Sequence, residues 1–272
     1  MAELPEITKL AGQMKTTLVG KTLATVELLQ EKCANIPPQE FQARAAGAKI
    51  TDVYHKGKWI ITALAGGENI LLSLGMGGDI IYFKSEETLP EKYQIKINFT
   101  DKTGYTARFW WFGKFLLVSD AELETDASTK DIAMDPFDAK FTPEYFAALL
   151  KGKKTQVKAF LMNQKNVGGI GNMYMHDILF KAGLHPQTKI SDMSADDVAR
   201  LYDSVLGVLD LSRSKGSFSY EADFFGDKGG YGMEDFLIGY KENQPCPACG
   251  DTIVQIKTGS TSSFVCPACQ KV

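Results

Sequence analysis

The sequence predicts an α+β protein with an N-terminal helix, a β-sandwich, a helical segment and a C-terminal zinc-binding β-hairpin. Three observations predict this fold class. Short apolar strands separated by turn residues fill residues 20–120, helical periodicity replaces them after about residue 125, and four of the five cysteines fall in the last 27 residues. From these changes of pattern we predict domains at 1–125, 126–240 and 241–272.

We predict one helix and eight short strands in the first 125 residues. Leu4, Ile7, Leu10, Met14 and Leu18 recur at helical spacing, which predicts a helix over 3–18. Glycine pairs and other turn residues then separate apolar runs at 22–29, 50–54, 59–63, 70–74, 80–83, 93–99, 105–109 and 115–118. Eight short strands at this spacing are typical of a β-sandwich or a barrel.

Helices follow the strands. Their expected ranges are 142–151, 155–163, 172–182 and 194–212. Residues 215–235 are rich in glycine and aromatic residues, which indicates a loop. Two strands, at 252–257 and 263–265, are expected to close the chain as a hairpin.

The composition excludes several classes of protein. The 272 residues are 44% hydrophobic and 23% charged, as in ordinary globular domains. A net charge of −3 excludes a globally basic nucleic-acid binder. Residues 151–185, however, hold six lysines and one acid, Asp177, so a phosphate-facing surface and a solvated lysine face both stay open. No apolar run approaches the ~20 residues of a membrane helix and the first six residues carry no base, so we expect a cytoplasmic protein with no membrane partner.

The C-terminal cysteines have the spacing of a zinc site. Two Cys-Pro-Ala-Cys motifs are separated by 16 residues and supply Cys246, Cys249, Cys266 and Cys269. In a reducing compartment this pattern favours one tetrahedral Zn²⁺ over two disulfides. Four thiolates leave no open position for a substrate, so the predicted ion is structural.

A glycine-rich segment precedes the third predicted helix. Gly168, Gly169 and Gly171 permit a tight turn, and Asn172 is placed to cap the helix. A helix start of this kind binds phosphate. A helix–turn–helix without a ligand is the alternative interpretation, and a dinucleotide loop is disfavoured because no strand immediately precedes the glycines.

Four motifs in register resemble the formamidopyrimidine-DNA glycosylase/endonuclease VIII family. They are Ala2–Glu6, the run Leu74–Gly78 with Phe112-Gly113, the segment 168–186 and the cysteine hairpin. The resemblance covers residues 2–271 in the family's order. It implies a helix–two-turn–helix domain in the middle of the chain and a two-domain clamp on double-stranded damaged DNA, acting as a monomer.

The resemblance also gives the first residues a chemical role. The family's N-terminal amine attacks C1′ of an extruded nucleotide, the base leaves, and lyase steps follow from a Schiff base. Here the amine would be that of Ala2 after Met1 is removed, since a free α-amine has a pKa near ~7.7–8. Glu3 would move protons, Glu6 would support the site, and Lys58 would bind a phosphate near the lesion. For Glu3 alone, an acid at a helix start is the alternative interpretation.

This chain departs from the family at the nucleophile, the phosphate clamp and the wedge. Ala2 stands where the family has proline. The α-amine of alanine is primary and can still form an imine. Thr261 replaces the arginine of the zinc hairpin and lacks its charge, with Lys257 as a possible substitute. Asp177 replaces a glutamate.

The predicted wedge keeps two of the family's residues and changes two others. Met76 and Phe112 remain, whereas Trp110 and Trp111 replace arginines. Strand alternation predicts that only one of the two tryptophans faces DNA, and packing inside the sandwich is the alternative. Phe218, Tyr220 and Tyr231 lie in the predicted loop, where they either stack on an extruded base or pack within the loop.

Two functions follow. The first is a bifunctional DNA glycosylase/AP lyase for oxidised bases, with Lys58, Lys154, Asn172 and Lys257 on phosphates. The second is a catalytically impaired paralogue that binds damaged or abasic DNA without excising bases. An RNA-binding or scaffold role is disfavoured because the chain supplies no repeated stacking platform.

Overall fold

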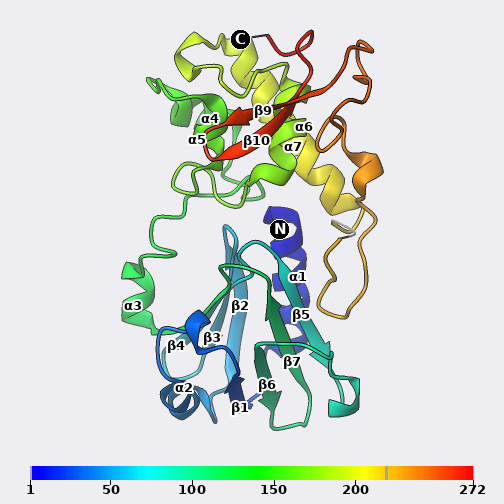
Figure 1. The fold of residues 1–272 in the computed structure, drawn as a ribbon. Coiled ribbons are helices and arrows are strands. Elements are labelled where there is room, and N and C mark those ends of the chain that lie inside the picture. Colours follow the sequence, from blue (N-terminus) through cyan, green and yellow to red (C-terminus); the bar gives the residue numbers. More distant parts are fainter. Residues whose placement is uncertain (1, 218–219, 272) are drawn as a thin grey trace. The chain divides into compact units, whose positions relative to one another are not determined.

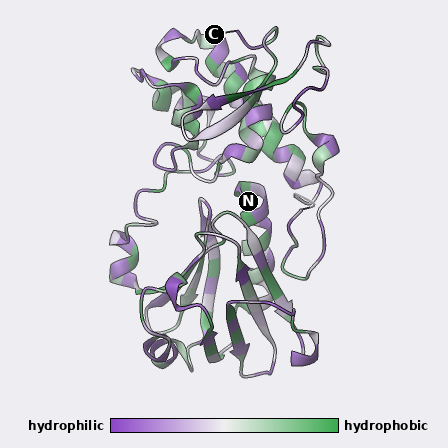
Figure 2. Ribbon diagram, in the orientation of Figure 1, coloured by the Kyte–Doolittle hydropathy of each residue, from purple (hydrophilic) through white to green (hydrophobic). Residues whose placement is uncertain are grey.

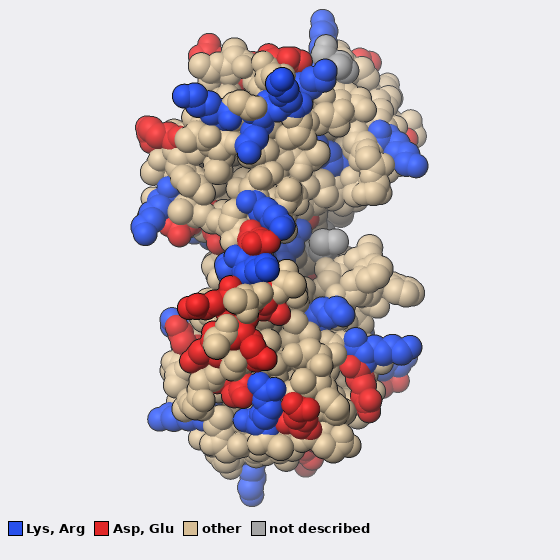
Figure 3. All heavy atoms as spheres, turned by 90° about the vertical axis from the view of Figure 1, so that its left-hand side faces the viewer, with Lys and Arg blue, Asp and Glu red and all other residues tan. Residues whose placement is uncertain are grey.

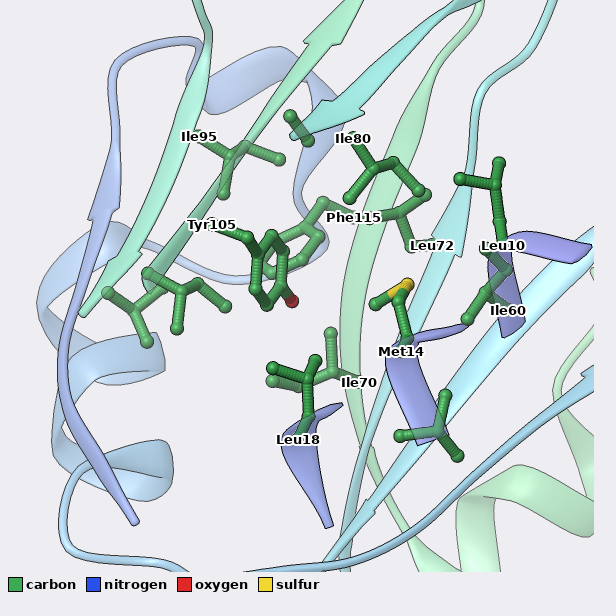
Figure 4. Packing of buried hydrophobic residues seen from close by; sticks show 14 of the residues in the cluster. Leu10, Met14, Leu18, Ile60, Ile70, Leu72, Ile80, Ile95, Tyr105 and Phe115 are labelled. Atoms are coloured by element: carbon green, nitrogen blue, oxygen red, sulfur yellow. The ribbon is translucent and has the colours of Figure 1, made fainter. Parts of the chain in front are cut away.

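An amphipathic helix, α1 (Leu4–Leu18), opens the computed structural model, which describes residues 2–217 and 220–271. Its apolar residues recur every three to four positions and form one buried stripe. In Figure 4, Leu10, Met14 and Leu18 of this stripe point into the same core as Ile60 and Ile80 of two different strands. The predicted helix over 3–18 is therefore confirmed.

Eight strands follow α1 and form two antiparallel sheets (Figure 1). The first sheet has the order β1-β6-β7-β5, and the second has the order β2-β3-β4-β8. The strands are β1 (Leu23–Leu28), β2 (Ile50–Lys56), β3 (Trp59–Leu64), β4 (Glu68–Ser73), β5 (Gly78–Phe83), β6 (Ile95–Phe99), β7 (Gly104–Phe109) and β8 (Lys114–Ser119).

The core of this part lies between the two sheets. Ile60, Ile70 and Leu72 of the second sheet belong to one buried cluster with Ile95 and Tyr105 of the first (Figure 4). Hydrophobic colour accordingly recurs along α1 and the strands in Figure 2. Of the two architectures predicted, the sandwich is the one the chain forms.

Two short helices that the sequence analysis did not predict flank the sandwich. They are α2 (Pro38–Ala45) and α3 (Asp120–Thr125). Ser119 and Glu122 form a capping box at the start of α3, which satisfies backbone donors at that end. Each helix is too short to show a clear apolar period in the sequence.

The rest of the chain is helical and ends in a hairpin. The helices are α4 (Pro143–Leu150), α5 (Val157–Met162), α6 (Asn172–Ala182) and α7 (Ala195–Ser214), and the hairpin strands are β9 (Val254–Thr258) and β10 (Thr261–Val265). The bounds of α6 coincide with the predicted range, whereas α5 is shorter than predicted and β10 begins two residues earlier.

The chain divides into two compact units. One segment, Lys215–Gly230, belongs to the first unit although the residues on both sides of it in the sequence belong to the second. The first unit holds the residues up to Asp131 together with Lys215–Gly230, and the second holds Ile132–Ser214 and Tyr231–Val272. The three predicted domains stay a prediction. Within the described residues, no helix combines the length and the apolar character needed to cross a membrane.

Candidate functional site

The start of α1 is buried although it carries two carboxylates. Ala2, Glu3 and Glu6 are 4%, 0% and 5% exposed. The backbone N–H of Glu3 donates to Oε2 of Glu6 at 2.9 Å, and the Glu3 side chain caps the first turn in return. This capping box fixes the N-terminal turn and places both predicted catalytic carboxylates beside Ala2.

A small cavity of the first unit lies against this turn. Ala2 and Glu6 line it together with Leu74 and Gly78, the two ends of the β4–β5 loop, and residues of the segment Lys215–Gly230. The cavity offers about 20 Å³ to the centre of a water-sized sphere. The N-terminal turn and the β4–β5 loop therefore share one site.

Side chains of α1 attach the segment Lys215–Gly230 to the helix. Lys9 Nζ lies 3.0 Å from Asp223 Oδ2 and donates to the carbonyl of Gly216 at 3.1 Å. Gln13 donates to Asp223 at 2.8 Å and accepts from the N–H of Phe224 at 3.0 Å. This helix face holds the wall of the cavity in place.

Lys58 lies in the tight turn between β2 and β3. Lys56 and Trp59 form the last cross-strand pair, so Gly57 and Lys58 are the two turn residues, and Gly57 has a positive φ of 56°. In Figure 1 this turn lies at the same end of the sandwich as the start of α1. The structure thus places Lys58 at a hairpin tip, directly before the first residue of β3.

The predicted wedge residues lie in two loops that are hydrogen-bonded to each other. The N–H of Met76 donates to the carbonyl of Trp111 at 2.9 Å, and the N–H of Trp110 donates to the carbonyl of Gly77 at 2.9 Å. Gly75 makes this approach possible, because a Cβ there would lie 2.1 Å from the carbonyl oxygen of Trp111.

Both tryptophans are exposed, and which of them faces DNA stays a prediction. β7 ends at Phe109, so Trp110, Trp111 and Phe112 belong to a loop and strand alternation does not apply to them. They are 41%, 68% and 78% exposed, and Met76 is 48% exposed. This also excludes their packing inside the sandwich. Phe112 has a φ of 59°, a conformation that is costly for a bulky residue.

The aromatic residues of the predicted loop have different environments. The ring of Tyr220 meets Trp110 edge-on at 5.5 Å. Tyr231 is 1% exposed and packs against Tyr174 and Phe236 in the second unit, as the packing interpretation expected. Phe218 lies outside the described residues.

In the second unit, the glycine-rich turn leads into α6 as predicted. A Cβ on Gly168 would lie 2.5 Å from the carbonyl oxygen of Ala133, so this close approach requires glycine. The N-cap is Gly171 and not Asn172, which is the first helical residue. The Asn172 side chain lies 3.4 Å from Nε2 of His176, while its Oδ1 is buried without a hydrogen bond.

Asp177, one position beyond His176, has a structural role. Its two oxygens accept from the backbone N–H groups of Leu237, Ile238 and Gly239 at 2.7–3.0 Å. The carboxylate therefore fixes the chain that leads into the zinc hairpin.

The four C-terminal cysteines form one cluster. Their Sγ atoms all lie within 4.8 Å of one another, with 3.8 Å between Cys246 and Cys269 and 3.4 Å between Cys249 and Cys266. Tetrahedral zinc with Zn–S bonds of about 2.3 Å requires sulfur–sulfur distances of roughly 3.8 Å. The cluster therefore fits one structural Zn²⁺ with no open position.

Hairpin residues surround a buried lysine of α5 that was not predicted as a site residue. Lys158 of α5 is 4% exposed, and its Nζ donates to Oγ1 of Thr258 and of Thr261 at 2.9 Å. It also contacts the carbonyl of Ser262 at 2.9 Å and Oγ of Ser263 at 2.7 Å. No carboxylate among the described residues pairs with this ammonium.

Burial changes the acid–base properties around Lys158. It lowers the pKa of Lys158 to about 8. Burial, together with the charge of Lys158, lowers the pKa of His176 to about 3, so that ring is neutral. Of these two groups, Lys158 is therefore the one that carries the positive charge at neutral pH.

The remaining predicted phosphate ligands of the second unit differ in their relation to this cation, and of them Thr261 contacts it directly. Thr261 is the first residue of β10, and the turn itself consists of Gly259 and Ser260. Lys257 is exposed, and because neighbouring strand residues point to opposite faces, it points away from the face on which Thr258 meets Lys158. Lys154 is exposed in the α4–α5 loop. Basic side chains are prominent on the second unit, the upper part of Figure 3.

Comparison with known proteins identifies the family. Family models match three stretches: the N-terminal domain of formamidopyrimidine-DNA glycosylase at 1–110, its H2TH domain at 132–221, and a zinc finger found in FPG and IleRS at 243–272. A formamidopyrimidine-DNA glycosylase of Roseiflexus sp. (strain RS-1) is 32% identical over 279 residues, covering 100% of both chains. The chain belongs to the formamidopyrimidine-DNA glycosylase family. The relative from Streptococcus pyogenes serotype M6 is 30% identical over 277 residues, covering 100% of this chain and 99% of its own.

Solved structures share the fold over the full length. Lactococcus lactis Fpg, in a complex with DNA that contains an abasic site, matches with a TM-score of 0.89 at 21% identity and covers 100% of both chains. The same enzyme in a complex with DNA that contains an oxidised pyrimidine matches with a TM-score of 0.87 at 22% identity, over 99% of this chain. The predicted α+β class, with a helix–two-turn–helix domain and a zinc hairpin, is confirmed.

Proposed function

We propose that this protein is a bifunctional DNA glycosylase/AP lyase that removes oxidised bases from double-stranded DNA. The observation that carries the proposal is the shared cavity. Ala2 and Glu6 line it, and so do Leu74 and Gly78, which flank the exposed Met76. A base displaced by the wedge would therefore leave the stack beside the N-terminal turn. The names of the 30–32% identical relatives support the same activity.

The chemistry begins at the first residue after Met1 is removed. The α-amine of Ala2 attacks C1′, the bond to the base breaks with its electron pair leaving on the base, and loss of the amine proton and opening of the sugar give a Schiff base. Glu3 follows Ala2 directly in the chain and is fully buried, so it would be the carboxylate that moves these protons. Glu6 keeps the turn fixed through its bond to the Glu3 amide.

Phosphate contacts would come from both units. In the first unit, Lys58 lies at a hairpin tip at the same end as α1 (Figure 1). In the second, the donor would be Nδ2 of Asn172, which lies 3.4 Å from Nε2 of His176, and Lys154 is an exposed lysine. Thr261, with the charge of Lys158 behind its hydroxyl, would take the place of the family's arginine. We further propose a monomer in a bacterial-type cytoplasm, associated with the nucleoid while bound to DNA.

Borohydride trapping tests the proposal. Purified protein, with the loss of Met1 established by mass spectrometry, is incubated with duplex DNA carrying an abasic site or an oxidised base, and borohydride is added. We expect a covalent adduct, and Glu3→Gln should reduce base release by about 10²-fold or more while it spares DNA binding. Glu31→Gln, an exposed acid, is the matched control.

An alternative outcome distinguishes the second function. If the protein binds abasic DNA but forms no adduct despite a free Ala2 amine, it is a DNA-binding paralogue without excision activity. The departures at Ala2, Thr261 and Trp110–Trp111 would then be the cause, and replacement of Ala2 by proline would test the first of them.

A further inference from the structure

The cavity beside Ala2 has a polar wall that the proposed excision chemistry does not use. This wall comes from the segment Lys215–Gly230 and includes Ser217 and Glu221. Both residues are buried, at 4% and 5% exposure. The space available to the centre of a water-sized sphere, about 20 Å³, exceeds the roughly 10–15 Å³ that one buried water needs. The cavity is therefore sized for a single water molecule.

Ser217 has the capacity to bind that water. Its Oγ is buried and makes no hydrogen bond to any described residue. An unsatisfied buried hydroxyl costs free energy unless it has a partner such as water. Because Ser217 also lines the cavity, its hydroxyl is placed to form a hydrogen bond with one water beside Ala2 and so to orient it.

Two other charged groups of the cavity wall have defined partners. Lys9 contacts Asp223 and the carbonyl of Gly216, and Glu6 accepts from the amide of Glu3. Burial is the largest influence on the pKa of Glu221 and raises it; a positive charge opposes this shift, and the carboxylates of Glu3 and Asp79 add to it. A carboxylate whose pKa moves toward neutrality is a better proton acceptor than an ordinary glutamate.

The residues on either side of Glu221 are held in place. The ring of Tyr220 packs on Trp110, and Lys228 Nζ donates to the carbonyl of Tyr220 at 2.8 Å. On the other side, Asp223 is bound by Lys9 and Gln13 of α1. Glu221 is thus carried on a segment attached at Tyr220 and at Asp223, which fixes its position as a proton-transfer group needs.

We propose that Glu221 is the general base that, with Ser217, holds and activates the water that hydrolyses the covalent imine on the α-amine of Ala2. This inference rests on the proposed function, since it needs the imine to form. It assigns the last step, release of the enzyme from its product, to a residue outside the N-terminal turn.

The hydrolysis of the imine needs only one water and the groups in the cavity. The water oxygen bonds to the imine carbon while Glu221 takes one proton from the water, and the C=N electron pair moves to nitrogen. Glu221 then returns the proton to nitrogen, and the C–N bond breaks with its electron pair going to the amine. The remaining hydroxyl loses its proton to solvent as the carbonyl forms. The products are an aldehyde, the free α-amine of Ala2 and the one proton that the protonated imine carried.

A trapping time course tests the assignment. Wild type and Glu221→Gln are reacted with excess abasic duplex DNA, borohydride is added at successive times, and trapped adduct and cleaved strand are measured separately. We expect Glu221→Gln to form the adduct within about two-fold of the wild-type rate and to lose it about 10²-fold more slowly. Ser217→Ala should slow the loss of adduct by about five-fold. Asp227→Asn, an exposed acid of the same segment, is the control and should match wild type.

The outcomes separate the two proposals. If wild type forms no adduct, the proposed lyase function is overturned and the inference falls with it. If wild type forms an adduct that Glu221→Gln and Ser217→Ala both release at the wild-type rate, the inference alone is overturned. Thermal unfolding of each variant identifies any that has lost its fold. If Glu221→Gln is unfolded, the rate of adduct loss in Ser217→Ala decides whether the inference holds, because this substitution removes only one oxygen.

Discussion

Lys158 donates to the hydroxyl of Thr261 at 2.9 Å, across 103 residues of sequence. The contact joins α5 to the first residue of β10, so the ammonium lies directly behind a hydroxyl at the end of the hairpin. The Thr261 hydroxyl in turn donates to the carbonyl of Thr258 at 3.3 Å. The pair therefore places a positive charge near a phosphate, together with a hydroxyl that would exchange the Thr258 carbonyl for a phosphate oxygen, where the family has a single arginine.

Replacing Lys158 by methionine should weaken binding to duplex DNA. Methionine keeps the length of the buried stem and removes the charge. We expect the slope of log K against log salt concentration to fall by up to about one unit, as for one lost phosphate contact. Titrations at four salt concentrations measure this, with the exposed Lys153→Met as the comparison. An unchanged slope would mean that the lysine only braces the hairpin.

Stability should depend on pH through the same lysine. Its folded pKa of about 8 lies below the ordinary value of 10.5, so between these two values the unfolded chain binds more protons. The free energy of unfolding contributed by Lys158 therefore rises as pH increases from about 8 to 10.5. Urea unfolding of wild type and Lys158→Met across this range should show their difference changing in favour of wild type. A constant difference would contradict a buried, destabilised ammonium.

The exposed wedge should matter for DNA binding and not for folding. Trp111 and Phe112 are 68% and 78% exposed, so Trp111→Ala and Phe112→Ala should change the free energy of unfolding by less than about 0.5 kcal/mol. Each should reduce affinity for lesion-containing duplex by about 1–3 kcal/mol if the ring stacks on bases. Leu29→Ala, which removes another exposed apolar side chain, should leave the affinity unchanged.

Phe112 also offers a test of strain. Because its φ is 59°, Phe112→Gly should relieve a conformational cost and raise the stability of the first unit by about 1 kcal/mol. The same substitution should lower excision activity, since the ring is lost. A thermal unfolding curve and a single-turnover assay together decide this. A less stable glycine variant would mean that the ring makes contacts that outweigh its strain.

Zinc removal should unfold the hairpin selectively. Structural zinc in comparable modules contributes of order 10 kcal/mol, so a chelator, or Cys249→Ala, should abolish DNA binding. The sandwich core contains none of the four ligands and should keep its cooperative unfolding. Cys33→Ser, a thiol change in the first unit, serves as the comparison and should leave the response to chelator unchanged.

Local patterns account for what the sequence could predict. The period of α1, the alternation in the strands and the spacing of the four cysteines are each set within a few neighbouring residues, so the fold class and the zinc site could be read without coordinates. The conformation of the wedge loops could not be predicted from local patterns. Trp110 and Trp111 follow an apolar strand directly, and only the hydrogen bonds from residues 76–77 reveal that both lie in a loop.

The site residues that escaped prediction depend on distant partners. Lys158 looks like one more lysine of a basic stretch until β9 and β10 surround its ammonium with oxygens. Ser217 and Glu221 lie in a glycine-rich segment with no period, and their position beside Ala2 arises because α1 attaches that segment more than 200 residues later. Such juxtapositions are properties of the tertiary structure.

The return of Lys215–Gly230 to the first unit has a consequence for how this protein can be divided. A gene truncated after codon 131 would encode all eight sandwich strands, yet it would lack Asp223 and with it the anchor that Lys9 and Gln13 hold. An isolated fragment of that kind would keep its N-terminal amine but leave one side of its surroundings open to solvent. An exchange of either half between relatives must therefore carry residues 215–230 with the first unit.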